Sequence, residues 1–456
     1  MRSKNSFGKI LTILLLLIIV AGVGFLFVSP QFEKNKPTVK FEDGIFWNLK
    51  DSLKMTLQDD TGIKYYKITF KDNSKEQVLT TEILAIPQQN IDLEIKPPKL
   101  DMFFKTKEIT IIVEAVDNSK WNFFDGNNVQ ATFKVKIDTK RPVANVITNS
   151  LAIRKGGSAV VVVEAHDENL KDAYITFNNE QRFELVPFYK EGYFVSLIAW
   201  PVTIEEFNRV SLVVKDKANN VTKSKVPLFI RDLKVKNDNI KISEKFINNV
   251  SASVLEESAQ PVPSELTDIF IAQNRGLRAK NIKALQDISL KFMNKDQINN
   301  FKVKPFRRLR GSRTAAGFAE RRHYFHSEEK IDEAWHLGLD WASVKKAPIR
   351  ATNGGKVIFN EYLGIYGNTI IIDHTMGLST LYAHTSISKV NVGDDINDKQ
   401  IIANTGATGA VLGDHLHFGV LVQGLEVNPL EWMDKNWIKT RITDILSESK
   451  KIIDSK

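Results

Sequence analysis

Two short stretches decide the fold of the C-terminal third of this chain: His336-Leu-Gly-Leu-Asp340 and His415-Leu-His417-Phe418. In both, polar and apolar residues alternate, which is the period of a β-strand with one face in a core. On a strand, His336 and Asp340 share a face, and His415 and His417 share another, roughly 6.5–7 Å apart. Two adjacent strands of this kind can direct three ligands at one point. We therefore predict a β domain with a metal site.

The composition narrows the chemistry of that site. The chain has 456 residues and no cysteine, which excludes disulfides, cysteine nucleophiles and thiolate metal sites. All but one of its eight histidines lie between His323 and His417. Two neutral imidazoles and one carboxylate, with an open fourth position, are typical of catalytic zinc. One histidine of the His-x-His pair and His384 then remain, and imidazoles can move protons or stabilise an oxyanion beside such a metal.

At these residues the chain resembles the lysostaphin-type (LytM-like) zinc peptidases, which cut peptide bonds in peptidoglycan. The likeness covers about 130 residues, from Phe306 to Asp434. The motifs follow the family's order: His336-x-Gly-x-Asp340, Ala347-Pro-Ile-Arg-Ala351 with Gly355, Tyr366-Gly-Asn-Thr-Ile-Ile-Ile-Asp-His374, Gly377-Leu-Ser-Thr-Leu-Tyr-Ala-His384, Gly406-Ala-Thr-Gly409, His415-Leu-His-Phe418 and Asn428-Pro429.

The resemblance implies a role for each matching residue. His336, Asp340 and His417 would hold Zn²⁺, and His384 and His415 would be the catalytic imidazoles. It also implies an antiparallel β peptidase domain. Three positions depart from the family pattern, namely Ala319, Asp414 and Gly419. None removes a ligand, but we expect them to alter the groove wall.

Other residues of this region have weaker interpretations. His374 reads as part of a hairpin turn. His323 and His326 are placed in a loop, beside a basic pair, Arg321 and Arg322, that could face substrate carboxylates. Tyr382 shares the predicted strand face of His384, so it lines the groove unless it packs in the core. Asn368 is a further groove candidate.

The N-terminus carries an uninterrupted apolar run, Ile10 to Val28. As a helix this run is long enough to span about one hydrocarbon core. Arg2, Lys4 and Lys9 precede it without an acid, which predicts a cytoplasmic N-terminus and a single-pass inner-membrane protein with its later domains in the periplasm. The alternative is a cleaved signal peptide. The net charge of +9 suits a membrane or cell-wall neighbour, and no nucleic-acid-binding signature accompanies it.

The segment between this anchor and the histidine-rich region reads as strands in two units about 100 residues long. Lys36-Pro37 and Arg141-Pro142 open them, and Tyr66-Lys-Ile-Thr-Phe70 returns as Ala173-Tyr-Ile-Thr-Phe177. We predict two tandem immunoglobulin-like β-sandwiches. Their expected task is spacing, or contact with proteins of cell-wall synthesis or hydrolysis. His166, the one histidine in them, reads as a surface loop.

The segment after the two strand-rich units has apolar residues at helical spacing. One set is Phe246, Ile247, Val250 and Val254; a second set, Leu266, Ile269 and Phe270, follows an expected helix cap at Ser264. This helical unit could brace the next domain. It could also limit access to the groove, through carboxylates that reach the metal or the basic Arg307–Arg310 segment: Glu256, Glu257, Glu265 and Asp268.

The predicted organisation of the chain has six parts. They are a cytoplasmic stub and membrane anchor (1–30), two sandwiches (31–140 and 141–235), the helical unit (236–304), the peptidase domain (305–435) and a C-terminal helix or tail (436–456).

Two functions from different classes remain. The first is a membrane-anchored zinc endopeptidase acting on peptidoglycan stems or cross-links, with the bond between D-alanine and diaminopimelate expected, and carboxypeptidase activity open at the same site. The second is a non-catalytic regulator of other wall hydrolases. Retention of all five site positions favours the enzyme.

Overall fold

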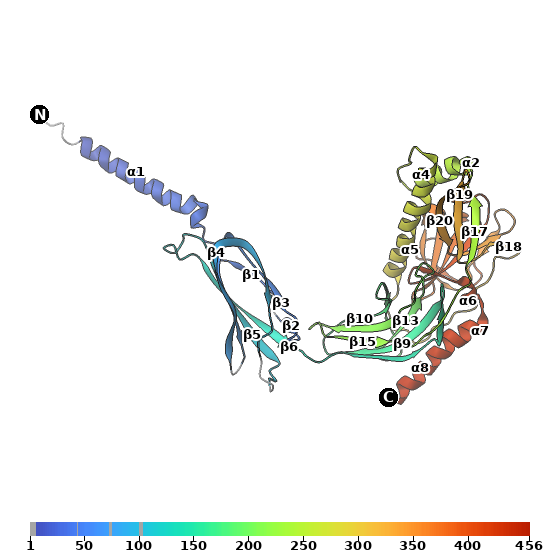
Figure 1. Ribbon diagram of the computed structural model, residues 1–456, viewed down its shortest axis with the longest axis horizontal. Coiled ribbons are helices and arrows are strands. Elements are labelled where there is room, and N and C mark those ends of the chain that lie inside the picture. The colour runs from blue at the N-terminus through green and yellow to red at the C-terminus, as the bar shows by residue number, and fades with distance from the viewer. Residues whose placement is uncertain (1–5, 43, 73–74, 100–103) are drawn as a thin grey trace. The chain divides into compact units, whose positions relative to one another are not determined.

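The computed structural model of the protein describes residues 6–42, 44–72, 75–99 and 104–456 (Figure 1). The chain divides into two compact units, and each is described by itself. The first holds the chain up to Pro142 together with Glu168–Lys171 and Lys215–Val221. The second holds the remainder, including the whole histidine-rich region.

The first unit begins with helix α1 (Ser6–Val28). Its Phe7–Val28 span is long and apolar enough to cross a membrane, with none of its most apolar window buried in the protein. A signal sequence near an N-terminus has the same properties. The predicted apolar run is therefore helical, whereas Arg2 and Lys4, on which the predicted orientation depends, lie outside the described residues.

The rest of this unit is one six-stranded sheet in the order β1-β3-β5-β6-β2, with β4 paired to β3. Its core contains Trp47, Leu57, Ile68 and Ile111. Strand β3 is long, and its register with β4 shifts between Gln58 and Ile63. The immunoglobulin-like assignment stays a prediction. The strands are β1 (Thr38–Lys40), β2 (Phe46–Trp47), β3 (Leu53–Lys71), β4 (Glu76–Ile95), β5 (Glu108–Asp117) and β6 (Asn128–Ile137).

Two four-stranded sheets follow, in the orders β11-β10-β14-β15 and β12-β13-β9-β7, with β8 and β16 paired beside them. The run Val160–Val163 on β9 is completely buried. His166 ends β9 and is exposed. The strands are β7 (Val143–Asn149), β8 (Ala152–Arg154), β9 (Ser158–His166), β10 (Leu170–Phe177), β11 (Gln181–Glu184), β12 (Val186–Pro187), β13 (Tyr193–Ala199), β14 (Val210–Asp216), β15 (Val221–Lys225) and β16 (Phe229–Arg231).

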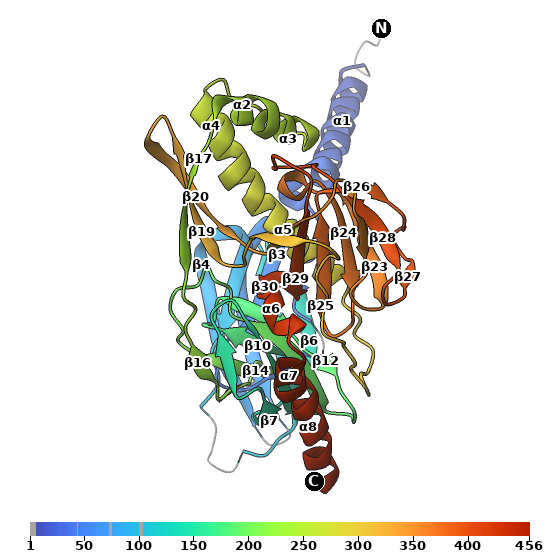
Figure 2. The same cartoon turned by 90° about the vertical axis from the view of Figure 1, so that its right-hand side faces the viewer.

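The helical unit is built as predicted for most of its length, but it begins with strand β17 (Lys236–Lys241), which pairs with β19. The cap before α4 is Glu265, not Ser264, and its side chain makes no cap hydrogen bond. Figure 2 shows α2 to α5 next to the strands that follow them. The helical elements are α2 (Glu244–Phe246), π-turn η2 (Ile247–Ser251), α3 (Ala252–Glu257), α4 (Leu266–Ile271), π-turn η3 (Ala272–Leu277) and α5 (Arg278–Phe292).

The histidine-rich region forms an eight-stranded sheet in the order β18-β21-β29-β25-β24-β23-β27, with β30 on β29. A three-stranded sheet β17-β19-β20 and another, β22-β28-β26, accompany it. The strands are β18 (Arg313–Ala316), β19 (Glu320–His326), β20 (Glu329–His336), β21 (Leu339–Ala342), β22 (Pro348–Arg350), β23 (Gly355–Tyr362), β24 (Asn368–Asp373), β25 (Leu378–Ala383), β26 (Thr385–Ser388), β27 (Asp395–Ile396), β28 (Ile401–Thr405), β29 (Leu416–Val422) and β30 (Leu425–Val427).

The helical unit and this sheet share one core. Ile247, Leu255, Phe270 and Leu285 pack in the same cluster as residues of the sheet, including Tyr324, Ile358, Leu381 and Leu421. Burial of a large apolar side chain stabilises a fold by roughly 1.5–3 kcal/mol. The helical unit is therefore a structural part of this domain and not a linker.

The C-terminal segment returns to the strands that precede the helical unit. Helix α8 packs on β7 and β9, with Leu446 and Ile453 buried. Before it, Trp432 Nε1 donates to Ser158 Oγ at 3.1 Å, and the Ser158 amide donates to Glu431 at 2.9 Å. The elements are α6 (Pro429–Met433), α7 (Lys435–Ile438), π-turn η5 (Lys439–Thr443) and α8 (Asp444–Ser455).

Candidate metal centre and catalytic site

Strand pairing brings the predicted ligands together. Antiparallel pairing of β21 with β29 places Asp340 opposite His417. His336 ends β20, and Leu337-Gly338 separates it from β21. The prediction of one continuous strand from His336 to Asp340 is therefore wrong, because the chain turns between them. Both side chains nevertheless reach the same point.

Three electron-pair donors converge there. His417 Nδ1 lies 2.8 Å from Asp340 Oδ1, and His336 Nε2 lies 3.0 Å from the same oxygen. His336 Nε2 and His417 Nδ1 are 3.2 Å apart. Tetrahedral zinc with bonds of about 2.0–2.1 Å spaces its ligand atoms roughly 3.3 Å apart. This donor set therefore fits a small divalent cation.

A backbone carbonyl and a glycine shape the site around these donors. His336 Nδ1 is 2.6 Å from the Gly317 carbonyl oxygen. If Nδ1 donates there, the lone pair of Nε2 is left facing Asp340 and His417. A Cβ at Gly338 would lie 2.5 Å from His417 Nε2, so the close approach of this turn to the imidazole requires glycine.

Two further histidines stand beside the donors. The His384 and His415 rings are 5.0 Å apart, and His415 Nε2 lies 3.7 Å from Asp340 Oδ1. Each places Nδ1 2.8 Å from a backbone carbonyl, that of Thr408 or Gly413. Donation from Nδ1 leaves Nε2 of each ring unprotonated, which is the state a proton acceptor needs.

Burial sets the charge of the site. Burial, together with the neighbouring His417 and His415 imidazoles, lowers the pKa of His384 to about 3. Burial also lowers the pKa of His417 to about 4. For Asp340, burial opposes ionisation, but His336 and His417 outweigh it and hold the pKa well below its usual range. His384 and His417 are thus neutral imidazoles beside one carboxylate, which suits a bound cation.

A pocket of about 290 Å³ opens over this group. One side is formed by the site histidines together with Ile365, Tyr366 and Leu412. The other side comes from β17, β19 and the helical unit, and includes Ile240, Ile242, Phe246, Phe270, Gln273, Asn274, Arg278 and Arg322. The helical unit is therefore one wall of the candidate site.

The weaker sequence interpretations have mixed outcomes. Tyr382 is not in the groove: it is 1% exposed, and its hydroxyl accepts from the Thr352 amide at 3.0 Å. The expected alternation fails because His384 has φ +60 and leaves the strand geometry. Asn368 does not line the pocket either, and its amide lies 3.3 Å from the Thr385 oxygen.

His374 follows β24 in the β24–β25 hairpin, as predicted, and both ring nitrogens have partners, the Gly354 oxygen at 2.7 Å and Thr380 Oγ1 at 2.8 Å. His323 and His326 lie on β19, so their placement in a loop is wrong. The alternation of that strand separates the basic pair. Arg322 faces the pocket, whereas Arg321 pairs with Glu333 at 2.7 Å.

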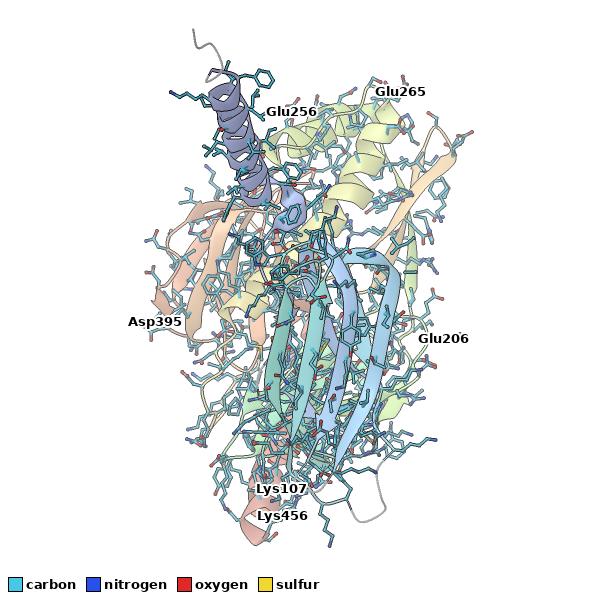
Figure 3. All side chains as sticks on the ribbon, turned by 90° about the vertical axis from the view of Figure 1, so that its left-hand side faces the viewer. Lys107, Glu206, Glu256, Glu265, Asp395 and Lys456 are labelled. Carbon is cyan, nitrogen blue, oxygen red and sulfur yellow. The ribbon has the colours of Figure 1, made fainter. Side chains whose placement is uncertain are left out.

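The carboxylates expected to block the site do not reach it. Glu256, Glu257, Glu265 and Asp268 are exposed and are not among the pocket residues. Figure 3 labels two of them, Glu256 and Glu265. Arg307–Arg310 line a different cavity, with Trp341 and Phe418, which alternate with the metal donors along β21 and β29. These carboxylates therefore do not block the pocket.

Sequence reasoning missed two pocket residues. Tyr366 lies in a quoted motif, and its hydroxyl donates to buried Glu426 at 2.8 Å while its ring contacts His417. Arg278 lies in the helical unit, where Arg275, Lys280 and Lys283 are close to it in sequence, so no local pattern distinguishes it from the other cations.

The three departures from the family pattern lie away from the pocket lining. Ala319 has φ +62, a conformation in which glycine is unstrained. Asp414 accepts from Thr405 Oγ1 at 2.5 Å and from the Lys346 amide at 3.0 Å. At Gly419 a Cβ would lie 3.3 Å from Leu381. None of the three lines the pocket, so the expectation that they change the groove wall is not met.

Comparison with known proteins agrees with this geometry. Residues 334–429 match the model of the protein family named Peptidase family M23. The DD-carboxypeptidase/endopeptidase Mpg of Neisseria meningitidis is 37% identical over 95 residues, which are 21% of this chain and 22% of that protein. The peptidoglycan DD-endopeptidase ShyB of Vibrio cholerae is 38% identical over 96 residues, with the same shares.

The match to these curated relatives spans about a fifth of their length. Among solved structures, the catalytic domain of lysostaphin from Staphylococcus simulans aligns with 27% of this chain and 94% of that domain, at 23% identity and a TM-score of 0.24. The family match covers β21 to β30 and includes His336, Asp340, His384, His415 and His417. Residues 334–429 of this chain therefore form a domain of peptidase family M23.

Proposed function

We propose that the protein is a zinc-dependent endopeptidase that hydrolyses peptide bonds in peptidoglycan. The observation that carries the proposal is the convergence of His336, Asp340 and His417 within 3.2 Å of one another, beside two further imidazoles in an open pocket. The names of the M23 relatives support peptidoglycan as the substrate. The bond between D-alanine and diaminopimelate is the proposed target, with carboxypeptidase action on stems open to the same site.

In this proposal His336, Asp340 and His417 hold Zn²⁺. When bound, zinc lowers the pKa of a water to roughly 7 and polarises the scissile carbonyl. His415, whose Nε2 faces the site, takes the proton of the attacking water. Once its Nε2 has taken up a proton, His384 stabilises the developing oxyanion or passes that proton to the leaving amine. Low pKa values keep His384 neutral until a charge develops next to it.

The pocket walls complete the reaction site. Ile365, Leu412 and Phe270 exclude water and accept the apolar parts of a peptide. Because the second sandwich and the helical unit are packed into the same compact unit, they support the site as a rigid frame. The regulator alternative is disfavoured by the complete set of donors and proton-transfer groups.

We further propose that α1 anchors the protein in the inner membrane with the M23 domain in the periplasm. Its length and apolar composition support a single span. Lys9 precedes the apolar run, together with Arg2 and Lys4 from outside the described residues. The two sandwiches then separate the catalytic domain from the membrane or contact other wall proteins.

The test is a metal analysis with a digestion. The chain without residues 1–28 is purified, its zinc content is measured, and it is incubated with defined cross-linked muropeptides. One zinc per chain and release of monomers are expected. Zinc-loaded, folded protein that cuts neither cross-links nor stems contradicts the enzyme, and stimulation of another hydrolase by that protein supports the regulator.

A further inference from the structure

The pocket wall supplied by the helical unit is fixed to the metal-site strand. Asn274 Nδ2 donates to Asp332 Oδ2 at 3.0 Å, and Arg275 Nη2 lies 2.8 Å from Asp332 Oδ1. Asp332 is buried on β20, the strand that ends at His336. A wall tied to the ligand-bearing strand holds its pocket residues at a set position.

The pocket lining carries an excess of positive charge. Its cations are Lys241, Arg278 and Arg322, and among the described lining residues Asp340 is the one carboxylate. Lys241 pairs with Glu328 at 2.6 Å. Arg322 lies 3.8 Å from Glu320 and 3.6 Å from Asp340. Two of the three charges are therefore compensated.

Arg278 is the exception. Its Nε and Nη2 donate to the backbone oxygen and Oδ1 of Asn274, at 3.1 and 2.9 Å. Both acceptors are neutral, and among the described residues no carboxylate lies within ion-pair distance of the guanidinium. Its charge acts at longer range on buried Glu426, whose pKa burial raises to about 7. The arginine is partly buried, and within the described residues its Nη1 makes no hydrogen bond or ion pair. An oriented guanidinium with a free face is suited to a carboxylate.

We propose that Arg278 binds a substrate carboxylate, and that the pocket therefore selects peptides with a free carboxylate next to the scissile bond. This inference rests on the proposed peptidase function. The remaining lining, including Ile365, Ala410 and Val411, suits small apolar side chains. The substrate class is thus a peptide that places a short apolar residue and a free carboxylate on either side of the bond that is cut.

The experiment compares two peptides that differ at one group. One carries the free carboxylate beside the scissile bond, and the other carries an amide there. Wild type should cut the free acid with kcat/KM roughly 10- to 100-fold higher, the worth of a charged hydrogen bond. Arg278→Gln should lose that preference through a higher KM, with kcat within a few-fold of wild type. Arg278→Lys should recover part of it.

Lys283→Gln is the matched control. It removes one positive charge from the same helix, outside the pocket, where Lys283 pairs with Asp287. It should keep the full preference. Zinc content and melting temperature of each variant show whether the site and fold are intact.

A binding measurement separates this inference from the proposed function. Product peptides in free-acid and amide form are titrated into metal-free wild type and Arg278→Gln by calorimetry. Tighter binding of the free acid to wild type alone supports Arg278 even if neither peptide is cut. An unchanged preference in Arg278→Gln, in cleavage and in binding, overturns the inference while leaving the peptidase proposal in place.

Discussion

At the scale of residues, alternation along β-strands predicted much of the candidate site. It correctly placed His417 and Asp340 on facing strands and Leu416 and Phe418 in the core. It failed at Tyr382, because the left-handed backbone of His384 ends the alternation, and a dihedral angle of this kind leaves no mark in the sequence. Arg278 reached the pocket through tertiary packing of a distant helix, which periodicity cannot predict.

The three proposed zinc ligands and His415 should differ in the effect of substitution by alanine. Alanine at His336, Asp340 or His417 should remove zinc and activity together, because each deletes a donor of a three-ligand site. His415→Ala should keep zinc and lose about 10²–10⁴-fold in turnover, the usual range of general acid–base catalysis. Metal analysis and muropeptide digestion of each variant provide the check. Full hydrolysis by zinc-free His336→Ala contradicts the ligand assignment.

Glu426 should make stability depend on pH. Burial raises its pKa from 4.5 to about 7. Between these values the folded state keeps a proton that the unfolded chain releases, so this contribution is complete below about pH 4.5 and is lost as pH rises through 7. Between pH 4 and pH 8 the free energy of unfolding of wild type should fall by roughly 2–4 kcal/mol relative to that of Glu426→Gln. Urea unfolding of the two metal-free proteins at a series of pH values measures this difference. If the free energy of unfolding changes with pH in the same way for both proteins, the prediction is contradicted.

At the scale of elements, strands and helices with a regular apolar period were predicted, and elements fixed by partners were not. Strand β17 reads Lys-Asn-Asp-Asn-Ile-Lys, with a single apolar residue, and it is a strand because β19 pairs with it. The helical unit showed its apolar stripes in sequence. Its docking against the catalytic sheet depends on the shared core and was left open between a brace and an occluding cover.

The β29–β30 hairpin should be a stability link to the second sandwich. Gln423, at φ +49 in its turn, accepts from the Glu184 amide at 2.8 Å and donates to the Glu184 oxygen at 3.0 Å. Gln423→Ala leaves these partly buried backbone groups without their side-chain partner, so the free energy of unfolding should fall by about 1–2 kcal/mol. Lys346→Ala is the control, because Lys346 is exposed and also has a positive φ, +58. It should change the free energy of unfolding little. Equal denaturation midpoints for both contradict the link.

At the scale of the whole molecule, the sequence predicted a mainly β chain with an N-terminal apolar helix and a C-terminal peptidase domain. It did not predict that residues far apart would form one compact unit. The joining contacts, such as Trp432 with Ser158, connect positions more than 270 residues apart. Such pairs follow from the complete fold and have no local signal.

Truncation should show where this unit ends. Residues 143–456 should fold cooperatively and bind zinc, since they hold the second sandwich, the helical unit and the M23 domain. Residues 305–456 should not, because they expose Leu381, Leu421 and other side chains that pack on the helical unit. Circular dichroism melting and metal content compare the fragments. A stable, zinc-loaded 305–456 contradicts the shared core.

Topology gives a separate prediction. If α1 is an uncleaved anchor with its basic end inside, a C-terminal reporter that works only outside the inner membrane should be active. The protein should also sediment with membranes and resist extraction by high salt. Activity of a cytoplasm-only reporter at the same position contradicts the orientation, and release of a shortened soluble chain supports a signal peptide.

Helix α8 has a consequence for the order of events during synthesis. It packs on β7 and β9, strands that precede it by about 290 residues, and Lys456 Nζ lies 2.7 Å from Glu164 Oε2. The second sandwich therefore cannot complete its packing until the chain has been made through residue 455. The closing helix thus delays the mature packing of β7 and β9 until synthesis has passed residue 455, long after these strands have left the ribosome.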